Sequence, residues 1–153
     1  MIEVTRVVDA PPSAVFAVLA DGWTYSGWVV GSSHIRDVDA AWPAEGARLH
    51  HSVGVWPLQL EDTTVVLAVS SGESLRMEAQ GWPFGTADVE VTLTADGGPR
   101  GGTLVRMRER ALRGPGKLLP EALQALVLRP RNRESLARLA ALAEGRARKT
   151  VEP

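Results

Sequence analysis

The sequence predicts an α+β fold in which a curved antiparallel sheet of six to seven strands wraps around one long C-terminal helix. Short segments that alternate apolar and polar residues repeat from Ser33 to Ala111, with turn residues between them, as in half-buried strands. Leu118 to Arg146 is the only long helical pattern in the chain. Because a sheet of this size curls, a helix across its concave side leaves space for a small apolar ligand.

The N-terminal part favours one strand and two short helices. Residues alternate from Ile2 to Asp9, which predicts the first strand. Pro11 and Pro12 favour the start of a short helix that ends near Ala20, since a proline at a helix start loses no hydrogen bond. The segment WTYSGWVV (23–30) favours a second short helix or turn. Six further strands are expected at 33–39, 47–55, 58–69, 74–80, 87–94 and 103–111.

The closing helix contains a change of phase. The first half has one apolar face, formed by Leu119, Ala122, Leu123, Leu126 and Val127. The second half has a rotated face, formed by Leu136, Leu139, Ala140 and Ala143. Pro130 lies between the two sets, so we expect a kink or break there and two helical arms that pack against different regions of the interior. Gly145 and the basic residues after it suit the helix end.

Length and composition indicate one domain of 153 residues, which we place at 1–147 with a C-terminal tail at 148–153. The net charge of −1 favours neither nucleic acid nor an anionic membrane as a partner. The absence of cysteine excludes disulfides. No apolar run is long enough to span or insert into a bilayer, and the first residues do not resemble a signal peptide. We therefore expect a cytoplasmic protein without a metal or cofactor, and a homodimer is left open.

Several segments together resemble one superfamily. VTRVVDAPPSAVFAVLAD (4–21) is similar to the opening of START-like proteins, and WTYSGWV (23–29) to their second helix. RMRER (106–110) is similar to the last strand, and RPRNRESLARLAALAE (129–144) to the closing helix. The superfamily is START-like, or SRPBCC, and includes the polyketide cyclase/dehydrase and lipid-transport proteins. This resemblance implies a helix-grip fold with a deep hydrophobic cavity, but no single reaction, because its members include carriers, cyclases and co-chaperone domains.

Two residues are candidates for chemistry inside such a cavity. Glu109 shares the inward phase of Val105 and Met107, and a buried carboxylate needs a partner, for which Arg6 on the first strand is available. A structural ion pair and a ligand-orienting or acid-base role both remain open for Glu109. His51 shares the apolar phase of its strand, so it faces the cavity or serves as a core histidine. The neighbouring His50 points to the other face, which argues against a zinc site.

Aromatic residues supply the remaining candidates. Trp42, Trp56 and Trp82 each precede a proline in a predicted loop, where they form a hydrophobic rim or plug one end of the sheet. Trp82 and Phe84 resemble a lid, and the resemblance places Tyr25 and Trp28 at the cavity entrance. The expected ligand-binding residues are Tyr25, Trp28, His51, Met77, Trp82, Phe84, Val91, Met107, Glu109, Leu123 and Leu126.

We therefore expect the protein to bind a hydrophobic or aromatic small molecule, lipid- or polyketide-like, between the sheet and the closing helix. One alternative is a polyketide cyclase/aromatase or dehydratase-type enzyme that uses the same cavity without a metal or cofactor, with Glu109, His51 and Tyr25 as candidate acid-base residues. Another is a protein-interaction module that uses the tryptophan loops.

Overall fold

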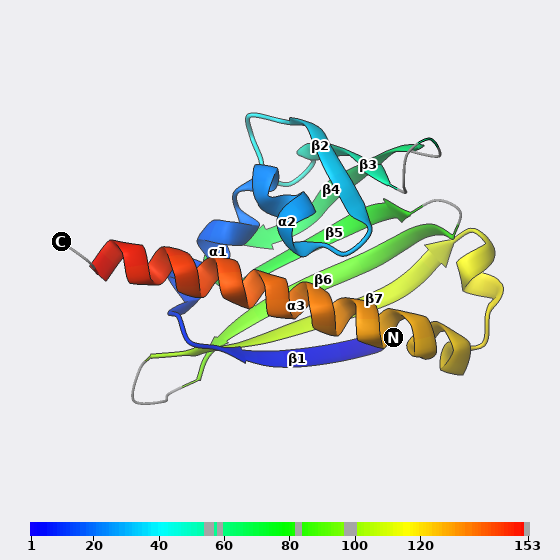
Figure 1. Ribbon diagram of the computed structural model, residues 1–153. Helices are drawn as coiled ribbons and strands as arrows, with labels where there is room; N and C mark the ends of the chain where they lie inside the picture. The colour runs from blue at the N-terminus through cyan, green and yellow to red at the C-terminus, as the bar shows by residue number, and fades with distance from the viewer. Residues whose placement is uncertain (54–56, 58–59, 82–83, 97–100, 152–153) are drawn as a thin grey trace.

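The computed structural model describes residues 1–53, 57, 60–81, 84–96 and 101–151. The predicted order of elements, one strand, short helices, six strands and a long helix, is confirmed (Figure 1). The strands are β1 (Ile2–Val8), β2 (Ser32–Val38), β3 (Arg48–Val53), β4 (Leu60–Ser70), β5 (Ser74–Gly81), β6 (Gly85–Ala95) and β7 (Thr103–Arg113). The helices are α1 (Pro12–Leu19), η1 (Gly22–Thr24), α2 (Tyr25–Trp28), η2 (Pro115–Leu118) and α3 (Glu121–Val151).

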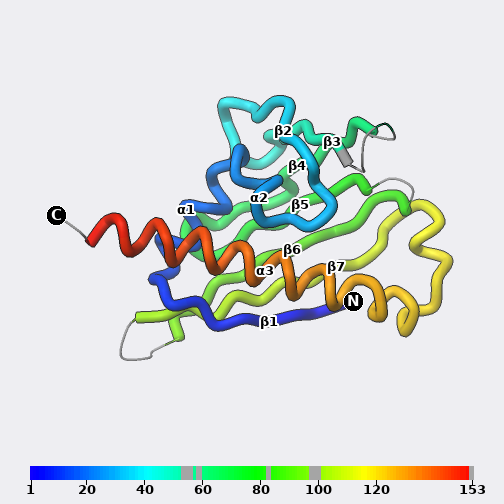
Figure 2. Tube along the Cα trace, viewed as in Figure 1, coloured from blue at the N-terminus to red at the C-terminus, as the bar shows by residue number. Residues whose placement is uncertain are grey.

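The seven strands form one antiparallel sheet in the order β1-β7-β6-β5-β4-β3-β2. The first strand therefore joins the last, with Ile2 opposite Glu109. The chain turns back after β7 through η2, so that α3 starts beside the N-terminus (Figure 2). The terminal amino group of Met1 lies 3.2 Å from a carboxylate oxygen of Glu121.

Helix α3 lies across one face of the sheet (Figure 1). Its second half supplies the buried apolar residues predicted for it: Leu136, Leu139, Ala140 and Ala143. These residues belong to the same apolar core as β-strand residues such as Leu75, Val91 and Met107. This part of the interior is filled, so the core that stabilises the fold lies under the second half of α3.

The two-arm prediction for the closing helix is wrong in one respect, because α3 is a single continuous helix through Pro130. Pro130 lies on the exposed face, and the carbonyl of Leu126 that it leaves without an N–H partner can be hydrated there. The helix also continues through Gly145, past residue 148 where we expected a tail to begin, to Val151. None of the described helices is long and apolar enough to cross a membrane.

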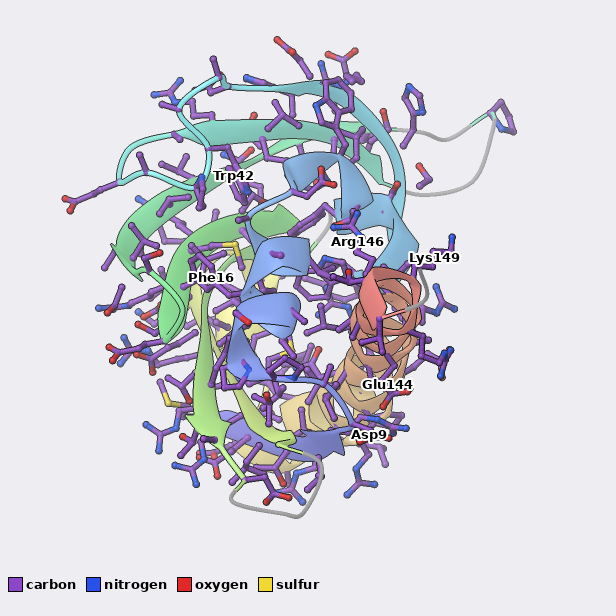
Figure 3. All side chains as sticks on the ribbon, turned by 90° about the vertical axis from the view of Figure 1, so that its left-hand side faces the viewer. Asp9, Phe16, Trp42, Glu144, Arg146 and Lys149 are labelled. Atoms are coloured by element: carbon purple, nitrogen blue, oxygen red, sulfur yellow. The ribbon has the colours of Figure 1, made fainter. Side chains whose placement is uncertain are left out.

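Helix α1 and the loops that follow it also pack against the sheet, beside the second half of α3. Figure 3 shows Phe16 and Trp42 on the sheet side of α1, and both are buried. The indole Nε1 of Trp42 donates a hydrogen bond to the carbonyl of Leu19, at 3.1 Å. On the outside, the backbone N–H of Asp9 donates to Glu144 on α3, at 3.0 Å. Trp42 thus plugs this end of the fold, whereas Trp56 and Trp82 lie outside the described residues.

A buried carboxylate also stabilises the middle of the sheet. Asp88 on β6 accepts two hydrogen bonds from Arg76 on β5, at 2.9 and 2.7 Å, and one from Arg110 on β7, at 3.3 Å. The Arg76 guanidinium holds the pKa of Asp88 below its usual range, with Arg110 adding to the effect and burial opposing it. This cluster connects three adjacent strands, β5, β6 and β7.

Candidate functional site

A cavity of about 330 Å³ lies between the sheet and the first half of α3. Its walls come from α2 and the start of β2, from β3, from the ends of β5, β6 and β7, and from α3. Most of the lining is apolar, and the polar side chains are few, as is typical of small-molecule pockets. The cavity and the packed core therefore occupy different halves of the space between sheet and helix.

Three alanines explain why the cavity exists. Ala79 on β5 pairs with Ala87 on β6, which pairs with Ala111 on β7, and all three line the cavity. This alanine row (Ala79, Ala87 and Ala111) leaves the sheet without bulky side chains at that level. Two residues along each strand, Met77 and Val89 fill the interior beside Glu109. The volume thus follows from small residues on three adjacent strands rather than from sheet curvature alone.

One buried side of the cavity carries a hydrogen-bonded set of polar groups. His51 Nε2 lies 3.1 Å from Thr64 Oγ1. The rings of Tyr25 and His51 are 5.5 Å apart between centroids. Burial raises the pKa of the Tyr25 phenol and lowers the pKa of His51, so both groups are uncharged at neutral pH. His51 itself is only 3% exposed.

Glu109 forms a charged pair at the cavity wall, but not with the predicted partner. Its carboxylate accepts hydrogen bonds from Arg131 Nη1 at 3.1 and 3.3 Å and from Asn132 Nδ2 at 2.7 Å. Arg131 Nε also donates to the carbonyl of Val30, at 3.1 Å. Arg6, which we expected as the partner, is exposed and lies opposite Val105 in the sheet. The pair therefore joins β7 to α3 and to the loop after α2.

The cavity opens to solvent between α3 and the turn that joins β5 to β6. The cavity mouth is formed by partly exposed apolar residues: Phe84, Leu119, Leu123 and Val127. Phe84 is 61% exposed, and its carbonyl accepts a hydrogen bond from the N–H of Gly116 at 2.9 Å. Gly85, with a φ of +108°, lies against the backbone of β7, where a Cβ atom would be 1.9 Å from the carbonyl oxygen of Arg113. Close backbone packing thus fixes Phe84 and Gly85 beside η2.

The structure brings five of the predicted ligand-binding residues to the cavity: Tyr25, His51, Phe84, Glu109 and Leu123. Four others are core residues that do not line it, namely Trp28, Met77, Val91 and Met107. The strand residues among them lie two or four positions beyond the alanine row, and Trp28 is buried with its ring against that of Tyr25. Leu126 is 72% exposed and faces a shallow outer groove, because it is rotated away from Leu123 on the helix. Trp82 lies outside the described residues.

Sequence reasoning missed Ser32, Arg131 and the alanine row. Ser32 opens β2 and is buried against the cavity, although its short side chain gave no signal in the strand pattern. Arg131 is distant in sequence from Glu109 and reaches it only through the packing of α3 on β7, which the sequence pattern does not show. The alanine row could have been found, since all three alanines fall on the inward phase at the ends of their strands.

Comparison with known proteins agrees with this architecture. Residues 1–144 match the family described as "Polyketide cyclase / dehydrase and lipid transport". The chain belongs to this family. No curated protein sequence matches the chain.

Solved structures of the same fold are similar over nearly the whole chain. Protein CV1439 from Chromobacterium violaceum has 21% identity and a TM-score of 0.66, covering 94% of this chain and 96% of its own. Protein NE0264 from Nitrosomonas europaea has 14% identity and a TM-score of 0.71, covering 95% and 94%. The di-domain ARO/CYC StfQ from the steffimycin biosynthetic pathway has 15% identity and a TM-score of 0.69, covering 95% of this chain and 51% of StfQ.

Proposed function

We propose that this protein binds a hydrophobic or aromatic small molecule in the cavity between the sheet and α3. The observation that carries the proposal is the cavity itself, about 330 Å³ in volume, apolar over most of its lining and open to solvent at one end. Apolar walls would supply affinity by removing ligand surface from water. The few polar groups, His51, Tyr25 and Glu109 among them, would then orient the ligand.

Filling the cavity from the alanine row tests this proposal. Ala87 is the middle member, so Ala87→Phe would project an aromatic ring into the space that the ligand needs. Ala68→Phe on β4 is the matched control, because Ala68 is exposed and does not line the cavity. Binding is measured by the fluorescence of N-phenyl-1-naphthylamine, an uncharged apolar probe, and native mass spectrometry of the purified protein identifies any ligand that co-purifies.

We expect the wild type and Ala68→Phe to bind the probe with similar affinity, and Ala87→Phe to bind it at least tenfold more weakly. Urea unfolding of both variants checks that they fold. The proposal would be abandoned if the wild type bound no apolar probe, or if the folded Ala87→Phe variant bound the probe as well as the wild type does.

A cyclase- or dehydratase-type enzyme is the second candidate. The observation that favours it is the buried group of Tyr25 and His51 beside the cavity, with His51 hydrogen-bonded to Thr64, since a phenol and an imidazole near a ligand are groups that can transfer a proton. The fold similarity to the ARO/CYC protein StfQ adds weight. Glu109 is a poor general base here, because Arg131 and Asn132 already occupy its oxygens. Turnover of a thioester-linked poly-ketone that falls in His51→Phe and Tyr25→Phe, with probe binding retained, would favour this function over simple binding.

A further inference from the structure

Two residues that line the cavity each carry a buried polar atom with no hydrogen-bond partner among the described residues: Ser32 Oγ and His51 Nδ1. Buried polar atoms are nearly always paired, so an unpaired pair in one cavity indicates a missing partner rather than chance. The other nitrogen of His51 is already bound to Thr64, which fixes the direction in which Nδ1 points. The partner that both atoms lack would therefore be part of the ligand.

The two side chains lie on neighbouring strands, β2 and β3, which allows one ligand group to serve both. Ser32 on β2 pairs with Val53 on β3, and His51 lies two residues before Val53 on the same face of β3. Diagonal neighbours in a regular sheet are about 7–8 Å apart, and a register shift between Ser32 and His34 alters this spacing, so we infer rather than measure that one oxygen atom between the side chains reaches both. A serine hydroxyl can donate or accept a hydrogen bond. His51 Nδ1 can also do either, because Thr64 can donate to Nε2 or accept from it.

The charges around the cavity favour an uncharged group at this position. Glu109 and Arg131 are the only charged side chains in the described lining, and they bind each other. His51 is kept neutral by burial, so it offers no positive charge to an anion. A ligand carboxylate beside Ser32 and His51 would lose its hydration without gaining a cationic partner. A ligand carboxylate at Arg131 would be repelled by the carboxylate of Glu109, which already binds that guanidinium.

The opposite side of the cavity is suited to the apolar part of the ligand. The cavity mouth consists of Phe84, Leu119, Leu123 and Val127, and its side chains are partly exposed. Ser32 and His51 are buried, by contrast. A ligand would therefore place its polar group in the interior and its hydrocarbon or ring body towards the mouth.

We propose that the cavity selects an uncharged ligand with a ketone or hydroxyl oxygen, and that this oxygen binds to Ser32 Oγ and His51 Nδ1. The inference rests on the proposed binding function and adds to it the chemical class of the ligand and its orientation. Carbonyl and hydroxyl oxygens satisfy the site equally, because each residue can take either role in the hydrogen bond.

Three probes of matched shape test the inference by isothermal titration calorimetry at pH 7: 2-naphthol, 2-methylnaphthalene and 2-naphthoate. The wild type should bind 2-naphthol at least tenfold more tightly than the other two. Ser32→Ala should reduce this preference to threefold or less, and His51→Phe should do the same. Ser33→Ala is the matched control and should leave the preference unchanged, because the Ser33 hydroxyl donates to the carbonyl of Ser52 instead.

The outcomes separate this inference from the proposed function. Equal affinity for 2-naphthol and 2-methylnaphthalene, or tightest binding of 2-naphthoate, would overturn the inference while leaving the binding function in place. A naphthol preference that survives both Ser32→Ala and His51→Phe would also overturn it. Binding of none of the three probes would remove the proposed function and the inference together. Urea unfolding should show Ser32→Ala as stable as the wild type, since the lost hydroxyl has no partner among the described residues.

Discussion

Replacing Arg131 by methionine should destabilise the protein strongly, although the side chain is partly exposed. The substitution keeps a long apolar stem and removes the guanidinium that donates to Glu109 and to the carbonyl of Val30. The Glu109 side chain is 7% exposed, so its charge would remain in a buried place with Asn132 as its nearest donor.

The size of the effect follows from burial. Removing one partner of a fully buried ion pair costs about 3–5 kcal/mol. The Arg131 side chain is 34% exposed and Glu109 retains one hydrogen bond, so we expect a smaller loss, about 2–3 kcal/mol. Arg138→Met provides the control, because Arg138 forms an exposed pair with Glu134 on the same helix. Exposed pairs of this spacing contribute only about 0.3–0.5 kcal/mol.

Equilibrium unfolding in urea, followed by circular dichroism at pH 7, measures both losses. The expected result is a much larger fall in the free energy of unfolding for Arg131→Met than for Arg138→Met. A difference of less than about 0.5 kcal/mol between the two variants would refute the reasoning, because the Glu109 carboxylate would then be adequately solvated without its guanidinium partner.

Two further predictions concern the turn beside the cavity and the centre of the sheet. Gly85→Ala should lower the free energy of unfolding by about 3 kcal/mol or more, because Gly85 has a positive φ and lies against neighbouring backbone. Gly72→Ala is the control and should lower it by about 1 kcal/mol, because Gly72 has a positive φ but open space around it. Similar urea midpoints for the two variants would contradict this prediction. Asp88, whose pKa is lowered in the folded state, stabilises the protein above the unfolded pKa of about 4, and this contribution is lost as pH falls through the folded pKa. Asp88→Asn should therefore lower stability at pH 7 and flatten its acid dependence, and an unchanged pH profile would argue against the mechanism.

The fold was predictable because its signals are local and repeated. Most strands show apolar residues with a period of two, and the segments between them are rich in glycine, proline or serine. The second half of α3 was predictable for the same reason, since Leu136 and Leu139 repeat on one buried face. The continuity of the helix at Pro130 was not predictable, because it depends on that residue facing solvent rather than a neighbouring element.

The candidate site was harder to predict because it depends on the position of each residue along its strand. Met107 and Glu109 share one face of β7, yet Met107 is packed in the core and Glu109 lines the cavity. Periodicity gives the face of a residue but not its distance along the strand from the helix that covers it. The partner of Glu109 was missed for a related reason: Arg131 is 22 residues away and reaches Glu109 through the packing of α3 on β7.

The division of α3 has a consequence for how this chain can diverge. Apolar residues that hold the helix on the core, such as Leu139, lie after Pro130, whereas the apolar residues of α3 that face the cavity, such as Leu123 and Val127, lie before it. Substitutions in the first half can therefore reshape the cavity with little penalty to folding. Mutations in one part of the helix can therefore change which ligand is bound, while a separate set of positions in the same helix is constrained by the need for a stable core.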